Sequence, residues 1–241
     1  MRIEPRGWQS DALDKYKVHE EKCFLIDATP GSGKTYFSGF CFKHELETHP
    51  DAFIIAVVPT TVLKNSFQES YHNLGIELTT SLKTSRPREF QGAAVTYQQL
   101  SNLTTVFEKW HEYGQKLVFV FDEIHHASEE NQWGDATVRC SNIATSIIAM
   151  SGTPFRGDNR KIACINYDAD GVAISDTSYT YRKAVSEKVC RPVFFIHDDG
   201  DAEYYFGLKG SKTLNETKIS DSDNKEVGKV SRVIFDSEST W

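Results

Sequence analysis

Residues 23–47 restrict the fold more than any other stretch of this chain. The apolar run CFLIDA (23–28) continues through the glycine-rich segment ATPGSGKT (28–35) into KTYFSGFCFKHELE (34–47), which has the length of a helix. A glycine-rich turn that joins a strand to a helix is the setting of a phosphate-binding loop, in which glycines let backbone N–H groups turn toward an anion. These residues therefore predict an α/β fold built around a P-loop.

Other apolar runs alternate with segments of helical length through the first 150 residues. The predicted strands are 52–58, 92–97, 116–122 and 146–150, and the predicted helices are 61–74 and a segment that ends near residue 110. Each strand run is almost continuously hydrophobic, which indicates burial on both faces. We therefore expect a mostly parallel sheet with helices on both faces and ligands at the carboxyl ends of its strands.

The alternation changes after about residue 155. Residues 178–189 are predicted to form a short amphipathic helix and residues 191–198 a last strand, whereas the polar chain from 210 onward is predicted to be a surface segment or linker. We therefore divide the chain into one domain over 1–197 and a polar C-terminal segment over 198–241.

Composition excludes several other classes of protein. The chain has an ordinary globular composition, with 39% hydrophobic and 25% charged residues. No apolar run approaches the roughly 20 residues of a membrane span, and the N-terminus lacks the apolar core of a signal peptide. Its five cysteines are widely spaced, so we expect reduced thiols in a cytoplasmic protein rather than disulfides. The net charge of −7 argues mildly against a dedicated, tight nucleic-acid-binding module.

The P-loop residues predict a site for a nucleoside triphosphate. Lys34 supplies a positive charge for the β and γ phosphates, and Thr35 offers a hydroxyl to Mg²⁺. The pattern departs from the usual one at Ala28, where a glycine is normally found. The predicted nucleotide-binding residues of the loop are Thr29, Pro30, Gly31, Ser32, Gly33, Lys34 and Thr35.

A pair of carboxylates follows the strand KLVFVFD (116–122). We expect this strand to lie beside the P-loop strand, so that Asp122 holds Mg²⁺ and Glu123 orients or deprotonates a water molecule. The predicted catalytic residues are therefore Lys34, Asp122 and Glu123. Two histidines follow, but they lack a third ligand at useful spacing, which disfavours a zinc site at His125 and His126.

Taken in order, five short motifs resemble those of one protein family. DEIHH (122–126) resembles the DExH box of superfamily 2 helicases and translocases. The other four motifs are RGWQSDAL (6–13), VPTTVLKNSF (58–67), VTYQQL (95–100) and SGTPFR (151–156). Over about residues 2–197, the pattern is most similar to the helicase domains of type I and type III restriction subunits and of related phage and bacterial DEAD/DEAH helicases.

The resemblance implies roles for residues outside the P-loop. Gln9 would read adenine with Arg6 beside it, and Trp8 would either stack on a base or pack in the core. His125, Ser151 and Thr153 would couple hydrolysis to movement, with a hydrogen bond between His125 and the serine.

The resemblance also implies contacts to nucleic-acid phosphates at two other strand ends. These would be made by hydroxyl and backbone N–H groups, although ordinary helix capping by threonine is the alternative. The implied contact residues are Pro59, Thr60, Thr61, Thr96 and Tyr97, together with Gln98.

The implied protein is the N-terminal RecA-like domain of a DNA-directed, ATP-hydrolysing motor that requires Mg²⁺. A motor of this family has two such domains, and the 44 residues after 197 are too few for a second, which needs on the order of 150. They would be a linker or the start of that domain, which would be supplied in cis or in trans, and hydrolysis by the isolated chain would be weak or absent. The alternatives are a nucleotide-binding switch or assembly module completed by a partner, and an RNA-directed DExH domain.

Overall fold

The computed structural model describes residues 3–127, 132–153, 161–192, 202–205 and 211–214. The chain divides into two compact units, Met1–Arg191 and Pro192–Trp241. In the second unit, strands β8 (Ala202–Tyr205) and β9 (Ser211–Leu214) pair in antiparallel orientation. The candidate site lies in the first unit.

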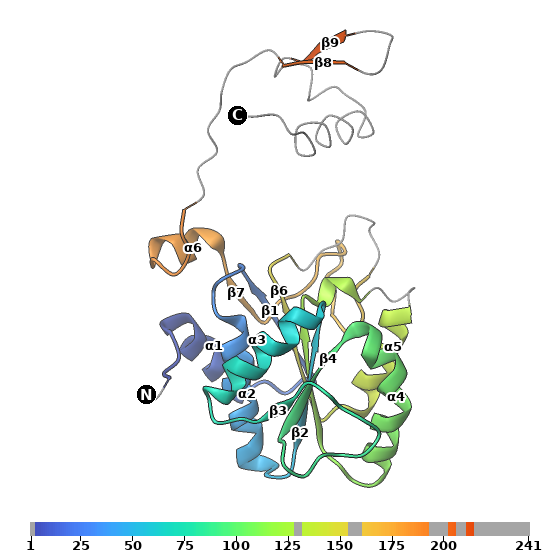
Figure 1. Cartoon of the computed structure of the whole chain (residues 1–241). Helices are drawn as coiled ribbons and strands as arrows, with labels where there is room; N and C mark the ends of the chain where they lie inside the picture. The colour runs from blue at the N-terminus through green and yellow to red at the C-terminus, as the bar shows by residue number, and fades with distance from the viewer. Residues whose placement is uncertain (1–2, 128–131, 154–160, 193–201, 206–210, 215–241) are drawn as a thin grey trace. The chain divides into compact units, whose positions relative to one another are not determined.

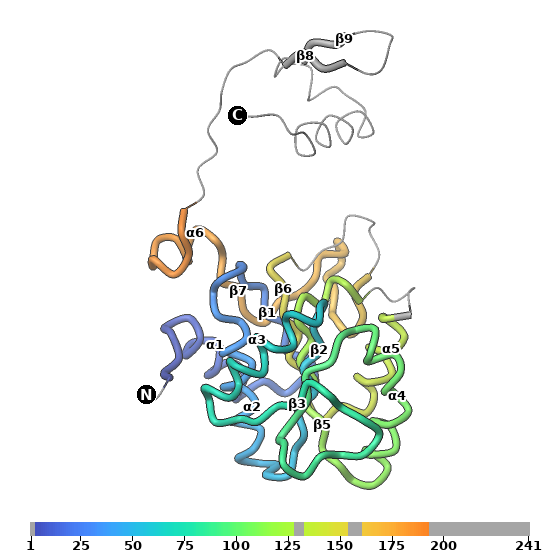
Figure 2. Tube along the Cα trace, in the orientation of Figure 1, coloured from blue at the N-terminus to red at the C-terminus, as the bar shows by residue number. Residues whose placement is uncertain are grey.

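The first unit is built on a sheet of seven parallel strands (Figure 1). Their order across the sheet is β3 (Leu78–Thr79), β4 (Gly92–Thr96), β2 (Phe53–Val58), β5 (Leu117–Asp122), β6 (Ser146–Ser151), β1 (Cys23–Ala28) and β7 (Thr177–Tyr179). The expected α/β class with a parallel sheet is confirmed. The chain returns to the outer side of β1 through β7 and the short helix α6 (Tyr181–Ser186), as the trace in Figure 2 shows.

Helices cover both faces of the sheet, as predicted. Helices α1 (Gly7–Lys17), α2 (Lys34–Thr48) and α3 (Thr61–His72) pack on one face, and α4 (Tyr97–Glu112) and α5 (Gln132–Ile143) pack on the other. Successive residues of β1 alternate between the two cores: Phe24 and Ile26 face α1–α3, whereas Leu25 faces the opposite layer. This double burial explains why the strands read as continuous apolar runs.

Several elements were not predicted from the sequence. In the first unit these are helices α1 and α5, the 3-10 turn Ile124–His126 and the strands β3 and β7, which have only two and three residues. In the second unit, β8 and β9 lie where no strand was expected. Residues 178 and 179, expected to begin a helix, belong to β7 instead, and the helix covers only Tyr181–Ser186. Of the last predicted strand, 191–198, residues 193–198 lie outside the described residues.

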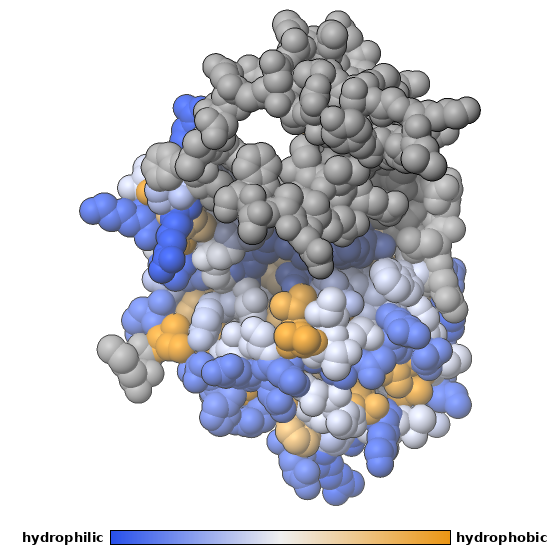
Figure 3. Space-filling model, turned by 45° about the horizontal axis from the view of Figure 1, so that its top comes forward, coloured by the Kyte–Doolittle hydropathy of each residue, from blue (hydrophilic) through white to orange (hydrophobic). Residues whose placement is uncertain are grey.

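The face of the first unit that Figure 3 presents is largely polar. Figure 3 shows apolar side chains as scattered spots among hydrophilic ones on the face that it presents. No helix within the described ranges is long and apolar enough to cross a membrane.

Candidate functional site

The P-loop joins the carboxyl end of β1 to helix α2. Gly31 and Gly33 adopt positive φ angles of 77° and 97°, which favour glycine, and Gly33 is the N-cap of α2. No side chain of the described chain caps this helix, so its first N–H groups and its dipole face the loop. Ser32 Oγ is buried and has no hydrogen-bond partner among the described residues. The loop therefore has the free donors that a phosphate group requires.

Three residues of the N-terminal segment donate hydrogen bonds to the backbone of the P-loop. Arg6 Nη1 and Trp8 Nε1 both donate to the carbonyl of Ser32, at 2.9 and 3.1 Å. Gln9 Nε2 donates to the carbonyl of Gly33 at 2.9 Å, and Gln9 Oε1 accepts the backbone N–H of Arg6 at 2.7 Å. A Cβ at position 33 would lie 2.9 Å from Gln9 Nε2, so the glycine also permits this contact.

These contacts define what the N-terminal residues do in the structure. Trp8 is buried and stacks on Phe37 and Tyr179, so the interpretation of Trp8 as a core residue is confirmed. Gln9 is buried with both ends of its amide hydrogen-bonded within the chain. Its role as an adenine reader, and that of Arg6 beside it, stay predictions.

Lys34 connects the P-loop to the carboxylate pair. Its side chain is only 8% exposed, and its Nζ donates to the carbonyl of Ala28 at 2.9 Å and to Glu123 Oε1 at 3.2 Å. The ion pair therefore brings two of the three predicted catalytic residues together.

The expected arrangement of the strands around this ion pair was wrong. The strand that ends in Asp122 does not lie beside the P-loop strand, because β6 is inserted between β5 and β1. The residue directly after β6, Gly152, lies close to the P-loop, since a Cβ there would be 3.0 Å from Pro30 Cδ.

Asp122 is a buried carboxylate at the end of β5. The residue is 7% exposed, and burial together with the adjacent charge of Glu123 raises its pKa to about 6, although Lys34 opposes the shift. Asp122 and the hydroxyl of Thr35 offer the oxygen ligands that Mg²⁺ prefers. The described residues contain no cluster of three His, Cys, Asp or Glu side chains suited to a metal, so a Mg²⁺ ion here would depend on phosphate oxygens and water for its other ligands.

Glu123 has a strained backbone and is held at several points. Its φ of 48° lies in the left-handed region, which costs a non-glycine residue on the order of 1 kcal/mol and is frequent at functional sites. Glu123 Oε2 accepts hydrogen bonds from Ser151 Oγ and from the backbone N–H of Gly152, both at 3.4 Å. The second oxygen of the carboxylate is thus directed over the end of β6.

The expected contact between His125 and Ser151 is present. His125 Nδ1 lies 2.9 Å from Ser151 Oγ and 3.4 Å from Glu123 Oε2, and Ser151 Oγ also accepts the backbone N–H of Thr153 at 3.1 Å. His126 is exposed and packs against the ring of His125. The structure therefore brings the three predicted coupling residues into one cluster; the coupling itself stays a prediction.

The residues predicted to contact nucleic acid lie at the ends of two adjacent strands. Val58 of β2 pairs with Thr96 of β4, which places Pro59, Thr60 and Thr61 next to the start of α4. Thr60 Oγ1 and Thr96 Oγ1 accept backbone N–H groups at 3.4 and 3.2 Å and cap α3 and α4. The capping alternative therefore holds for these two hydroxyls, while Thr61 and Gln98 are exposed.

Tyr97 does not present its hydroxyl to the surface. The ring is 1% exposed, and the hydroxyl donates to the backbone carbonyl of Asp122 at 3.0 Å. The expected hydroxyl contact to a phosphate is therefore corrected: the side chain of Tyr97 anchors α4 to the end of β5, because its ring packs against Phe121 and Trp133.

Two residues near these sites were not identified from the sequence. Cys190 Sγ donates to the carbonyl of Pro30 at 3.3 Å, a contact from the far end of the domain that no local signal predicts. Lys64 is buried on α3, and it lies on the same helix face as the core residues Phe67 and Tyr71. A lysine at an apolar position of the helical repeat was the signal that could have found it.

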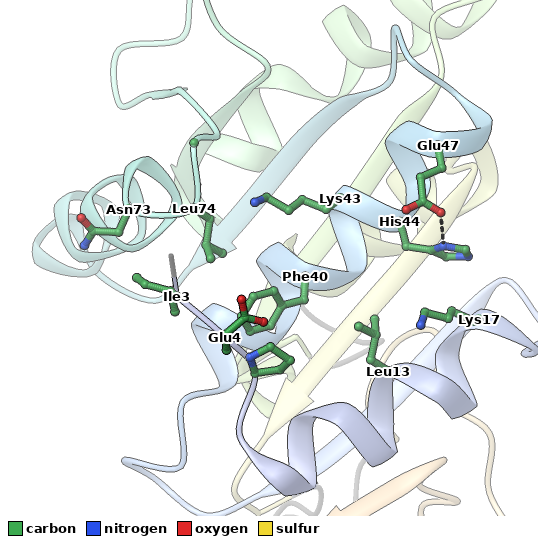
Figure 4. A pocket seen from close by; sticks show the side chains of 12 residues that line it. Ile3, Glu4, Leu13, Lys17, Phe40, Lys43, His44, Glu47, Asn73 and Leu74 are labelled. Atoms are coloured by element: carbon green, nitrogen blue, oxygen red, sulfur yellow. Dashed lines mark hydrogen bonds and ion pairs between the residues drawn. The ribbon is translucent and has the colours of Figure 1, made fainter. Parts of the chain in front are cut away.

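A hollow beside α2 is separate from the P-loop. It encloses about 470 Å³ between α1, α2 and the turn after α3, and its lining includes Leu13, Phe40, His44, Glu47 and Leu74 (Figure 4). None of the predicted nucleotide-binding residues lines it, so it is not the candidate site.

Comparison with known proteins places the chain in a family. The family described as "Type III restriction enzyme, res subunit" matches residues 2–156. An uncharacterized protein of Mycobacterium leprae is 36% identical over 206 residues, which are 83% of this chain and 34% of the relative. An uncharacterized protein of Mycobacterium tuberculosis is 38% identical over the same coverage. The chain thus spans about a third of the length of these curated relatives.

Two solved structures share the fold. A nuclease-deletion mutant of the type ISP restriction-modification enzyme LlaGI, in complex with a DNA substrate mimic, superposes with a TM-score of 0.58 at 14% identity, over 78% of this chain and 21% of that chain. The type ISP enzyme LlaBIII bound to DNA gives a TM-score of 0.54 at 13% identity, over 78% of this chain and 16% of that chain.

The five ordered motifs, the parallel sheet with its P-loop and the family match agree, so the predicted resemblance is confirmed. The chain belongs to the type III restriction enzyme res subunit family and contains the RecA-like, helicase-like N-terminal domain of superfamily 2.

Proposed function

We propose that this chain binds Mg²⁺-ATP and hydrolyses it as the first RecA-like half of a DNA-directed helicase or translocase. The observation that carries the proposal is the convergence of Lys34, Asp122 and Glu123 at the carboxyl ends of the parallel sheet, where ligands of open α/β sheets bind. A buried lysine beside two carboxylates at a P-loop suits the charge of a triphosphate and its cation.

ATP binding would exchange the partners of Lys34. The ammonium is paired with Glu123 at 3.2 Å, and a β or γ phosphate with its greater charge would attract it toward the loop. Thr35 and Asp122 would hold Mg²⁺, which neutralises charge on the phosphates when bound. The loss of the lysine contact would leave Glu123 free to act on water.

Glu123 would then orient the attacking water and accept its proton. Ser151 and the N–H of Gly152 contact Oε2 and leave Oε1, the oxygen now paired with Lys34, for the water. A carboxylate that is held in this way has little freedom to turn away from the γ phosphate. His125 contacts both Glu123 and Ser151, so a movement at the end of β6 would displace the Glu123 carboxylate.

DNA is the proposed second partner. Thr60, Thr61 and the first turn of α4 lie at the same edge of the sheet as the nucleotide site. The two structural relatives are complexes with DNA or a DNA mimic, and the family is named for a restriction enzyme subunit. A second RecA-like domain would complete the site, and the curated relatives are about three times longer than the matched region.

The proposal is tested by ATP turnover with and without DNA. We expect the 241-residue chain to bind Mg²⁺-ATP and hydrolyse it slowly, and a longer form that includes a second RecA-like domain to be stimulated by DNA. Lys34→Met should remove turnover, whereas Lys43→Met, which removes an exposed charge from the same helix, should not. Stimulation by RNA but not DNA would replace the partner, and ATP binding without any turnover would favour a nucleotide-binding switch.

A further inference from the structure

Two buried hydroxyls connect helices α2 and α3, which lie side by side on one face of the sheet (Figure 1). The hydroxyl of Tyr71 lies 2.8 Å from Ser38 Oγ, and Ser38 Oγ donates to the carbonyl of Thr35 at 2.8 Å. Tyr71 and Ser38 are both 0% exposed. These two residues, which we call the Thr35 tether, join the last turn of α3 to the first turn of α2.

The direction of both hydrogen bonds follows from the groups that form them. A carbonyl oxygen only accepts, so Ser38 uses its single hydroxyl proton on Thr35. The Tyr71 hydroxyl is then the donor of the second bond. Burial raises the pKa of Tyr71, so the hydroxyl keeps the proton that this bond requires. Both protons of the tether are therefore directed toward the carbonyl of Thr35.

Helix α2 carries a glycine at the point where α3 crosses closest to the tether. A Cβ at Gly39 would overlap with Leu74 Cδ1 and would lie 3.7 Å from Tyr71 Cζ, so the glycine permits this close approach. Replacing both partners of a buried hydrogen bond by apolar groups can be nearly neutral for stability. An apolar contact would therefore be enough to pack the two helices, and the two hydroxyls call for a further explanation.

The residue that the tether holds is the one whose hydroxyl is offered to Mg²⁺. Thr35 follows Lys34 in the first turn of α2, and the N-cap of this helix is Gly33, which has no side chain to cap it. The first turn of a helix has N–H groups without intrahelical partners, so it is held less firmly than the turns that follow. A side chain that bonds the Thr35 carbonyl, and is itself fixed to α3, limits rotation of this turn.

We propose that Ser38 and Tyr71 are positioning residues for the Mg²⁺ ligand Thr35, and that they hold the first turn of α2 so that the Thr35 hydroxyl faces the cation of bound Mg²⁺-ATP. Both residues are fully buried, so they act through Thr35 and not on the nucleotide itself. The inference rests on the nucleotide-binding function proposed above, and it adds two residues that lie outside the P-loop and outside the five motifs.

The test is the Mg²⁺ dependence of nucleotide binding by the 241-residue chain. Binding of a fluorescent, non-hydrolysable ATP analogue is measured in EDTA and along a Mg²⁺ titration. We expect Ser38→Ala to raise the Mg²⁺ concentration at half-maximal tightening about fivefold, the factor that corresponds to one hydrogen bond. Tyr71→Phe should raise it by a smaller factor, because Ser38 keeps its bond to Thr35. Binding in EDTA should stay close to that of the parent chain for both variants.

Tyr16→Phe is the matched control. Tyr16 is another buried tyrosine whose hydroxyl is bonded to α2, but its partner is Glu45 in the last turn of that helix. This variant should lower the unfolding midpoint in urea, as Tyr71→Phe does, and leave the Mg²⁺ dependence unchanged. The double variant Ser38→Ala/Tyr71→Phe should need no more Mg²⁺ than Ser38→Ala alone, since Tyr71 acts through Ser38.

A tether that only stabilises the core predicts a different result. The unfolding midpoints of Ser38→Ala and Tyr71→Phe would then fall while their Mg²⁺ dependence equalled that of the parent chain, and this outcome would overturn the proposal. Additive effects in the double variant would also overturn it, because Tyr71 would then act by another route. If one single variant does not fold, the other carries the titration against the same control.

The outcome is separable from that of the proposed function. Mg²⁺-dependent binding by the parent chain, combined with unchanged Mg²⁺ dependence in both variants, would reject the positioning role and leave the ATP-binding function standing. Binding by the parent chain that is equally tight in EDTA would reject the Mg²⁺ role of Thr35 and the tether together, while ATP turnover would still decide the ATPase proposal. A parent chain that binds no nucleotide would reject both.

Discussion

Two lysines are buried at the same edge of one sheet, and their surroundings differ. Lys34, above β1 and β6, is 8% exposed and forms an ion pair with Glu123 next to Asp122. Lys64, above β2 and β4, is 5% exposed and has an amide oxygen instead. The first cation is neutralised within the chain before any ligand arrives. The second has no carboxylate partner among the described residues, so the two halves of this edge differ in how a buried cation is neutralised.

The two regions are joined through Tyr97. Tyr97 is the first residue of α4 and follows the N-cap Thr96, and its hydroxyl donates to the carbonyl of Asp122 at 3.0 Å. A shift of the first turn of α4 would therefore be transmitted to the end of β5. This contact is a direct physical route between the proposed DNA edge and the nucleotide edge.

The largest expected effect comes from removing the charge of Asp122, which lies next to the ion pair of Lys34. Asp122→Asn should lower ATP turnover at least about 100-fold, because the Mg²⁺ ligand is lost. It should also stabilise the fold at pH 7.5 by on the order of 2 kcal/mol, because a raised pKa means that the charged carboxylate is unfavourable in the folded state.

The pH dependence fixes the sign of this gain. Below the ordinary pKa of an aspartate, near 4, Asp122 is protonated in both states, and the variant should gain little. As the pH rises from about 4 to about 6, Asp122 ionises and the folding stability of the parent chain falls. The gain of the variant should therefore reach its full size above pH 6. Urea unfolding at pH 4, 5, 6 and 7.5 measures it, with the exposed Asp11→Asn as control. An equal effect at every pH would contradict the assigned cause.

A smaller effect should follow from giving Lys64 the partner that Lys34 already has. Gln99→Glu places a carboxylate at the position of the amide oxygen that Lys64 shares with the backbone N–H of Thr96, and it should stabilise the fold by about 1 kcal/mol through a charge-assisted hydrogen bond and a favourable charge near the N-terminus of α4.

The neighbouring variant separates the specific effect from net charge. Gln98→Glu adds the same charge at the preceding exposed position, and we expect it to leave the unfolding midpoint in urea almost unchanged. If both variants changed stability equally, the difference between the surroundings of the two lysines would have no energetic basis.

The sequence predicts the parts of this edge that depend on local pattern. The P-loop, Lys34 and the acidic strand end follow from residues that are close together in the chain, and continuous apolar runs indicate a sheet buried on both faces. Strand order does not follow from local pattern, which is why the insertion of β6 between the two functional strands was missed.

Side-chain direction is equally hard to infer from a motif. Tyr97 stands in a predicted nucleic-acid motif, but its ring fills the core against Phe121 and Trp133. Lys64 stands in another such motif, and its exceptional feature is the absence of a carboxylate partner within the described chain, which only three-dimensional packing shows. Both depend on contacts between residues more than twenty positions apart.

The central claim, that Glu123 activates water for ATP hydrolysis at this P-loop, is tested most directly by a single-turnover measurement. Glu123→Gln and the parent chain, with a second RecA-like domain and DNA supplied, are saturated with labelled Mg²⁺-ATP, and bound ATP and released phosphate are followed in the same reaction. Glu89→Gln, an exposed change in the loop before β4, is the control. We predict that Glu123→Gln binds ATP but releases phosphate at least about 100-fold more slowly, because the general base is lost. Phosphate release at the rate of the parent chain would contradict the account.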